Sequence, residues 1–135
     1  MNDFVKYHLP LLLWMLIIFV SSAIPSFDFP EVPWWGWAKI VHLIYYGFLC
    51  FLAWRAAPHQ TTIPSASSNP KLAAWILTLL YGASDEFHQL FTPGRHGRVT
   101  DVMIDGVGGL LFLAALYVYT RIQTAMTRSS SDSGV

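Results

Sequence analysis

The densest group of chemically active side chains lies between residues 85 and 105 and combines carboxylates, an imidazole and guanidinium groups. Its members are Asp85, Glu86, His88, Gln89, Arg95, Arg98, Asp101 and Asp105. Carboxylates and imidazoles transfer protons near neutral pH, and guanidinium groups bind phosphate oxygens. The segment therefore predicts either acid–base chemistry or the binding of an anionic group.

A second polar set precedes this segment at helical spacing. Lys39, His42 and Tyr46 follow an i, i+3, i+7 pattern, and residues three or four apart share one face of a helix. Asp101 and Asp105 are related in the same way, as i and i+4. These stripes predict polar helix faces that meet inside a helical protein.

Four apolar stretches must position these side chains. They cover about residues 5–24, 37–56, 72–91 and 102–122, each near the roughly 20 residues that a helix needs to cross a bilayer. Hydrophobic residues make up 54% of the chain and charged residues 12%, about half the charge of a typical soluble domain. Barrel strands would instead alternate over about 10 residues. The predicted fold is an all-α membrane protein, a bundle of four transmembrane helices.

The segments between the apolar stretches carry the helix breakers. Residues 25–36, 57–70 and 92–100 are rich in proline, glycine or serine, which predicts loops. Residues 125–135 form a polar tail that we expect to be disordered. A cleaved signal peptide is the alternative for the first stretch, because Lys6 precedes an apolar core. A single basic residue before that core favours a retained helix.

Basic residues predict the orientation, since cytoplasmic loops are enriched in lysine and arginine. With four spans, the side that carries both termini holds Lys6, Arg55, Lys71, Arg121 and Arg128. The other side holds Lys39, Arg95 and Arg98. We therefore predict that both termini are cytoplasmic and that the polar residues gather at the outer face. The net charge of zero gives no basic field for a nucleic-acid partner.

Each polar residue also has a structural interpretation. Lys39 and Arg98 alone would be headgroup anchors. His42 and Tyr46 alone would be packing residues, and Gln89 would bridge helices. The shared depth of the set favours a functional pocket, because a charge near the bilayer centre costs at least about 2.5–3.5 kcal/mol. A polar network that only locks the helices together is the structural alternative.

Asp101 and Asp105 are the candidate metal ligands, since hard divalent cations take carboxylate oxygens. Glu86 and His88 lack the His-Glu-x-x-His spacing of a zinc site, and we expect no structural zinc. No other cofactor is indicated, because the sequence has no glycine-rich phosphate loop that follows a strand.

Residues 83–109, ASDEFHQLFTPGRHGRVTDVMIDGVGG, resemble the signature of the VanZ-like family. The resemblance rests on an acidic-acidic-x-His-Gln run, a Pro-Gly-Arg loop and an Asp-led, glycine-rich helix. SSAIP at 21–25 and KIVHLIYYGFL at 39–49 are similar to the family's earlier elements. The resemblance covers about residues 11–115. Asp105 departs from the family's usual asparagine and adds a second carboxylate to this helix face.

The resemblance implies a small multi-pass protein of the bacterial inner membrane, with residues 1–124 as its VanZ-like four-helix transmembrane domain. The family's namesake is associated with resistance to the glycopeptide antibiotic teicoplanin. The family name implies a setting at the cell envelope and no particular reaction. The expected partner is a membrane lipid or a lipid-linked envelope precursor.

Two functions are compatible with these residues. In an enzyme acting at the outer leaflet, the catalytic residues would be Glu86, His88, Asp85 and His42, and the substrate-binding residues Arg95, Arg98, Lys39, Gln89, Tyr46 and Ser22. In a non-catalytic protein, the same pocket would bind an anionic lipid, a lipid-linked precursor or the lipid tail of the antibiotic. The sequence leaves open the choice between enzyme and binder, and the oligomeric state.

Overall fold

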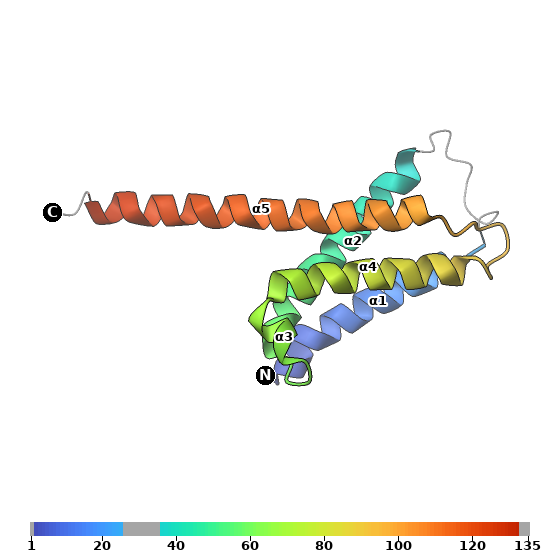
Figure 1. Cartoon of the computed structure of the whole chain (residues 1–135), viewed down its shortest axis with the longest axis horizontal. Coiled ribbons are helices and arrows are strands. Elements are labelled where there is room, and N and C mark those ends of the chain that lie inside the picture. Colours follow the sequence, from blue (N-terminus) through green and yellow to red (C-terminus); the bar gives the residue numbers. More distant parts are fainter. Residues whose placement is uncertain (1, 26–35, 133–135) are drawn as a thin grey trace.

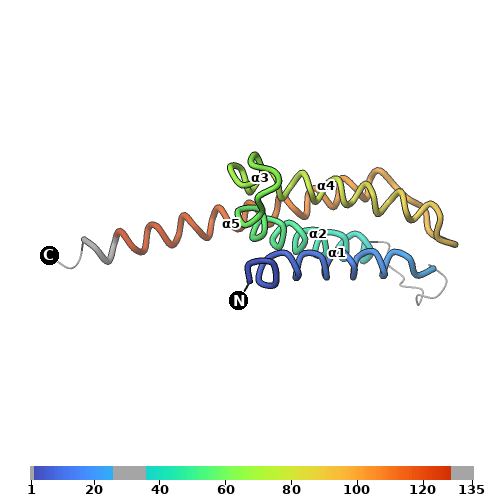
Figure 2. The backbone as a smooth tube through the Cα atoms, turned by 90° about the horizontal axis from the view of Figure 1, so that it is seen from below, coloured from blue at the N-terminus to red at the C-terminus, as the bar shows by residue number. Residues whose placement is uncertain are grey.

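The computed structural model of the chain describes residues 2–25 and 36–132. Its elements, in order, are η1 (Phe4–His8), α1 (Leu9–Ser22), α2 (Gly36–Ala56), η3 (Ala57–His59), α3 (Pro64–Ser68), α4 (Pro70–Gln89) and α5 (Val99–Asp132). The described residues contain no strand, so the predicted all-helical class is confirmed. The helices α4 and α5 run nearly antiparallel beside each other, α2 lies at an angle to both, and α5 extends well beyond the other helices (Figures 1 and 2).

Three helical segments within the described residues are long and apolar enough to cross a membrane. They are Phe4–Ser22, Gly36–His59 and Val99–Arg128. Their outer faces carry large exposed apolar side chains such as Leu16, Ile44 and Leu111. A soluble monomer rarely exposes so much contiguous apolar surface, which indicates a membrane protein.

The predicted bundle of four transmembrane helices is confirmed in part. The third predicted stretch, 72–91, forms α4, which has 20 residues. This helix is not among the segments apolar enough to cross a membrane. The reason is its charge, since Lys71 lies in its first turn and Asp85 and Glu86 near its end.

One connecting segment and the C-terminal tail differ from the expectation. Residues 57–70 fold into the short helices η3 and α3. The helix α5 continues to Asp132, whereas we expected disorder from residue 125 onward. No glycine or proline interrupts the chain between Leu110 and Asp132, and threonine hydroxyls bond back to preceding carbonyls along this stretch. Most of the first predicted loop, 26–35, and residues 133–135 lie outside the described residues.

Glycines let α2 and α5 approach at backbone distance. A Cβ atom added to Gly108 would lie 2.5 Å from the main-chain oxygen of Leu43, and one added to Gly47 would lie 3.2 Å from the main-chain oxygen of Gly108. Small residues at such positions allow close helix packing in membranes. This contact fixes the height of α5 against α2, and hence where the polar residues of the two helices meet.

Hydrogen bonds to main-chain carbonyls attach α1 to its neighbours. The Trp14 indole donates to the carbonyl of Tyr45 at 2.9 Å, and the Tyr81 hydroxyl donates to the carbonyl of Met15 at 2.5 Å. Each bond joins α1 to a different helix, since Tyr45 lies in α2 and Tyr81 in α4.

The Tyr81→Phe substitution should lower stability by about 0.5–1.5 kcal/mol, the usual net contribution of one hydrogen bond. Thermal unfolding in detergent, followed by tryptophan fluorescence, measures this effect. Tyr45→Phe is the matched control, because no hydrogen bond of the Tyr45 hydroxyl occurs among the described residues. Equal Tm values for the two variants would show that the bond to Met15 contributes nothing.

Candidate functional site

The polar residues converge where the end of α1, the end of α4, the start of α2 and the start of α5 lie together. These four helix ends occupy one end of the molecule (Figure 1). The convergence follows from the antiparallel order of the chain, since alternate helix ends must meet on one side. Side chains that the sequence places far apart therefore become neighbours.

The centre of the site consists of one residue from each of three helices: His42 from α2, Glu86 from α4 and Asp105 from α5. One potential ligand atom of each residue lies within 4.8 Å of those of the others. His42 Nδ1 is 2.9 Å from Asp105 Oδ1. The Asp105 side chain is 0% exposed, and its Oδ2 has no hydrogen-bond partner among the residues that the structure describes. We call these three residues the acid–histidine centre.

A glycine makes room for the buried carboxylate. A Cβ atom added to Gly82 would lie 2.7 Å from Asp105 Oδ2. Gly82 precedes Glu86 by one helical turn, so both face α5. Gly82 was not among the predicted site residues, although its i, i+4 spacing from Glu86 could have identified it.

A second network surrounds Asp85. The Ser22 hydroxyl donates to Asp85 Oδ1 at 2.5 Å, and the Gln89 amide donates to Asp85 Oδ2 at 3.0 Å. Gln89 also approaches Glu86 Oε1 at 3.4 Å. All four side chains are buried. The network therefore links the end of α1 to α4 and orients Glu86 toward the acid–histidine centre.

The loop between α4 and α5 closes over the end of α4. The main-chain N–H of Arg98 donates to Glu86 Oε2 at 2.7 Å. Gly97 lies against the main-chain oxygen of Glu86, where a Cβ atom would clash. No role was predicted for Gly97. The close contact with the Glu86 main chain shows that a residue without a Cβ atom is needed at this position.

Cationic side chains lie around the centre. Lys39 forms an ion pair with Asp101 at 2.9 Å. Arg98 is exposed, and its guanidinium forms no hydrogen bond or ion pair with another described residue. Arg95 donates to the carbonyls of Ser21 and Ile24, at 3.1 Å each. A cation is favourable there, because the end of a helix carries partial negative charge.

The structure separates the predicted site residues into groups. Ser22, His42, Asp85, Glu86, Gln89 and Asp105 lie together, with Tyr46 stacked near the His42 ring. His88 lies elsewhere, with its ring centroid 4.4 Å from that of Phe19. The two histidines predicted as acid–base residues therefore have different surroundings, and only His42 contacts a carboxylate. Asp101 pairs with Lys39, and a metal site on Asp101 and Asp105 stays a prediction.

The centre is rich in negative charge. Asp85, Glu86 and Asp105 are all buried, and within the described part of the chain no lysine or arginine side chain pairs with them. Among the described residues, His42 is the one group that forms an ion pair with any of them. Buried carboxylates without such partners are costly, which distinguishes this centre from a bundle-stabilising ion pair.

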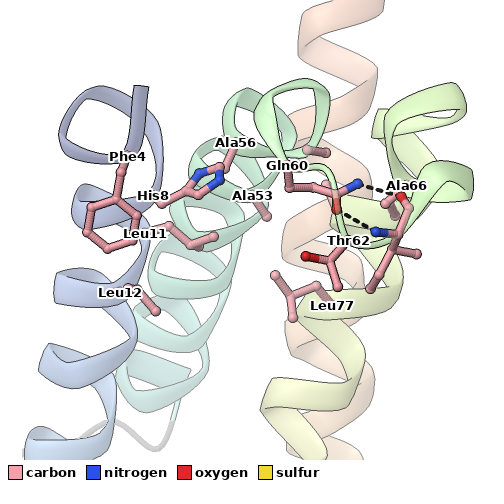
Figure 3. Close-up of a pocket in the computed structure, with 14 residues that line it drawn as sticks. Phe4, His8, Leu11, Leu12, Ala53, Ala56, Gln60, Thr62, Ala66 and Leu77 are labelled. Atoms are coloured by element: carbon pink, nitrogen blue, oxygen red, sulfur yellow. Dashed lines mark hydrogen bonds between the residues drawn. The ribbon is translucent and has the colours of Figure 1, made fainter. Parts of the chain in front are cut away.

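An apolar cavity of about 400 Å³ lies at the other end of the bundle. Residues of η1, α1, α2 and α4 line it, including Phe4, Leu11, Ala53 and Leu77 (Figure 3). None of the acid–histidine residues lines this cavity. The lining of this cavity is mostly apolar. The buried carboxylates and His42 lie at the other end of the bundle.

Long apolar helices with a buried acid–histidine centre at one end define a helical membrane protein with a polar site. Residues 7–120 match the family described as VanZ/LLP1. The chain therefore belongs to the VanZ/LLP1 family, as the signature at 83–109 predicted. No curated protein and no solved structure matches the chain.

Proposed function

We propose that this protein acts at a membrane face on an anionic, lipid-linked envelope molecule, with the acid–histidine centre as its reactive group. The observation that carries the proposal is the contact of His42 Nδ1 with the buried Asp105 at 2.9 Å. A base held by a third group is the recurrent arrangement for activating a nucleophile. A purely electrostatic site for an anion would instead have cations at its centre.

The proposed chemistry assigns a role to each member of the centre. Asp105 fixes the orientation of the His42 ring through Nδ1. His42 accepts the proton of a water or hydroxyl as its oxygen attacks the substrate, and returns that proton to the departing oxygen. Glu86 is held in place by Gln89 and by the main chain of Arg98. Its carboxylate would polarise the attacking water or hydroxyl.

Lys39 and Arg98 suit the headgroup of such a substrate. Both side chains lie at the solvent-accessible edge of the site, and ammonium and guanidinium groups bind phosphate or carboxylate oxygens. The lipid part of the substrate would remain beside the exposed apolar faces of the helices, including Ile44 and Leu80. Substrate and protein would then share the bilayer as solvent.

The proposal includes a membrane topology. The 20 residues of α4 extend about 30 Å, the thickness of the hydrocarbon core. Packed beside α2 and α5, α4 would form the fourth span with its acidic end sheltered. Both termini would lie in the cytoplasm of a bacterium, with the acid–histidine centre at the outer face of the inner membrane, because more basic residues fall on the terminal side.

A non-catalytic binder of the same molecule is the second candidate. The Asp85 network favours this candidate. Both oxygens of the Asp85 carboxylate accept hydrogen bonds, from Ser22 and from Gln89, so the network forms a scaffold that exists before any ligand binds. A link to teicoplanin resistance through the lipid tail of the antibiotic would belong to this version. It remains a prediction from family resemblance.

Turnover separates the two candidates. Purified protein is incubated with a polyprenyl phosphate or a phosphatidylglycerol in nanodiscs, and products are identified by mass spectrometry. His42→Ala should lower the rate by about 10²–10⁴-fold, as expected for a lost general base. His59→Gln is the control, because this histidine contacts Tyr7 and Asp3, away from the centre.

Equal product from wild type and His42→Ala would exclude the catalytic role. Lipid that co-purifies unchanged with wild type, and is lost in Arg98→Ala, would support the binder instead. If Glu86→Gln bound the lipid and kept the wild-type rate, Glu86 would have no part in the reaction.

A further inference from the structure

We propose that His42, Glu86 and Asp105 bind one divalent transition-metal ion, of the Zn²⁺ or Mn²⁺ type. Each residue offers one ligand atom, and the three atoms lie within 4.8 Å of one another. They come from α2, α4 and α5, so the ion would join three helices. The sequence analysis placed a divalent ion on Asp101 and Asp105, and the structure points to a different set.

An unpaired atom inside the centre indicates that something is needed there. Asp105 Oδ2 is buried and has no hydrogen-bond partner within residues 2–25 and 36–132, although the whole side chain is 0% exposed. A buried polar atom left without a partner costs about 1–3 kcal/mol, and more when the group is charged. A metal ion supplies the missing partner, because a carboxylate oxygen is a metal ligand as well as a hydrogen-bond acceptor.

The acidic side chains around the centre favour a cation. Asp85, Glu86 and Asp105 are buried, and among the described residues only His42 pairs with any of them as a cationic group. Lys39 is committed to Asp101. Two positive charges on an ion would offset most of the negative charge that these carboxylates bring into the bundle.

The donor atoms restrict the kind of ion. One imidazole nitrogen and two carboxylates form a mixed nitrogen and oxygen set, which suits zinc or manganese better than the all-oxygen sites of calcium. The single cysteine, Cys50, is buried in a core with Ala53 and Ala74 and is not part of the set. Metal bonds of about 2.0–2.2 Å place ligand atoms roughly 3–4 Å apart, so the side chains need to close by only about an ångström.

Neighbouring groups already orient the ligands. Gln89 donates to Glu86 Oε1, and the main-chain N–H of Arg98 donates to Glu86 Oε2. Hydrogen bonds of this kind typically hold metal-binding carboxylates in position. Gly82 leaves the space that Asp105 needs. Binding of the ion needs no substrate and can be measured without turnover, but His42 is a ligand in the metal-loaded protein, so its role as a free base belongs to the metal-free protein.

The test is direct titration with the metal alone. Full-length protein purified without a histidine tag is stripped with EDTA in detergent, and Zn²⁺ or Mn²⁺ is added in a calorimeter. Wild type should bind one equivalent. Glu86→Gln and Asp105→Asn should each weaken binding by more than about tenfold, since loss of even a supporting group costs that much.

Two control variants show whether a loss of metal affinity is specific to the proposed ligands. His59→Gln removes an imidazole from the other acid–histidine pair, His59 with Asp3 at 3.5 Å, and should keep full affinity. Asp101→Asn should also keep it, which distinguishes the proposed set from one built on Asp101 and Asp105. Wild type that binds neither ion overturns the proposal, and so does undiminished binding in both ligand variants.

If the ligand variants do not fold, a measurement on wild type alone still tests the site. Co²⁺ added to the stripped protein should give the visible absorption of a site with nitrogen and oxygen ligands and no thiolate band. Zn²⁺ should then displace it in a one-to-one ratio. A thiolate band, or Co²⁺ that remains featureless and free, counts against the acid–histidine centre as the binding site. Failure of turnover would leave these results unaffected, so the two proposals fail separately.

Discussion

The Gly108→Ala substitution is expected to lower the unfolding free energy by about 1–3 kcal/mol, the usual cost of overpacking a tight contact. The new Cβ would lie 2.5 Å from the main-chain oxygen of Leu43 and 3.2 Å from the main-chain nitrogen of Gly47. Both obstacles are backbone atoms, so no side-chain rotation relieves the contact. The helices α2 and α5 must separate, and His42 then moves away from Asp105.

Gly106→Ala is the matched control for this prediction. Its Cβ would meet the Leu79 Cδ2 atom at 2.7 Å, the far end of a flexible side chain that can rotate away. Thermal unfolding in detergent should therefore show a much smaller decrease in Tm for Gly106→Ala. If the two variants unfold at the same temperature, the backbone contact between α2 and α5 does not determine stability.

The helices were predictable because hydrophobic run length depends on local sequence alone. The predicted stretch 37–56 differs from α2 by one residue at its start, and the spacing of Lys39, His42 and Tyr46 correctly placed them on one helix. The membrane character followed from the same runs. The number of spans did not follow, because the acidic end of α4 lowers its hydropathy while its length still suits a bilayer.

The sequence alone could not show which of the site residues contact one another. Spacing shows which residues share a helix face, whereas the height and rotation of one helix against another decide which faces meet. His42 and His88 were equivalent candidates on paper, and only packing puts His42 beside Asp105 and His88 beside Phe19. Asp101 was paired with Asp105 for the same reason, and the structure gives it Lys39 instead.

Glycine positions connect the fold to the site. Gly108 sets the contact of α5 with α2, and Gly82 provides space on α4 for the carboxylate of Asp105. Asp105 lies less than one turn before Gly108 on the same helix, so the close approach that glycine allows also brings the carboxylate to His42. The unpaired Oδ2 is thus a consequence of tight packing around a charged group, which a bound ion would resolve.

Replacing Asp85 should separate the effects of hydrogen bonding and charge. Asp85→Ala removes the acceptor for Ser22 and Gln89, which leaves Ser22 with its bond to the Phe19 carbonyl and Gln89 with its longer contact to Glu86. Hydrogen bonds to charged groups contribute about 1.5–3 kcal/mol, so we expect a loss of this size, concentrated at the attachment of α1 to α4. Hydrogen exchange of α1 amides, measured together with Tm, should show the release of that helix.

Asp85→Asn should behave differently, because its amide oxygen still accepts from Ser22 and a rotated Gln89 amide can pair with its nitrogen. The same substitution removes one negative charge from the buried acidic group, which relieves repulsion with Glu86 and Asp105. We therefore expect the unfolding free energy of Asp85→Asn to lie within about 0.5 kcal/mol of wild type, the range of mild substitutions, or above it. A loss as large as that of Asp85→Ala would mean that the charge itself stabilises the bundle, and the acidic centre would then need a cation already present inside it.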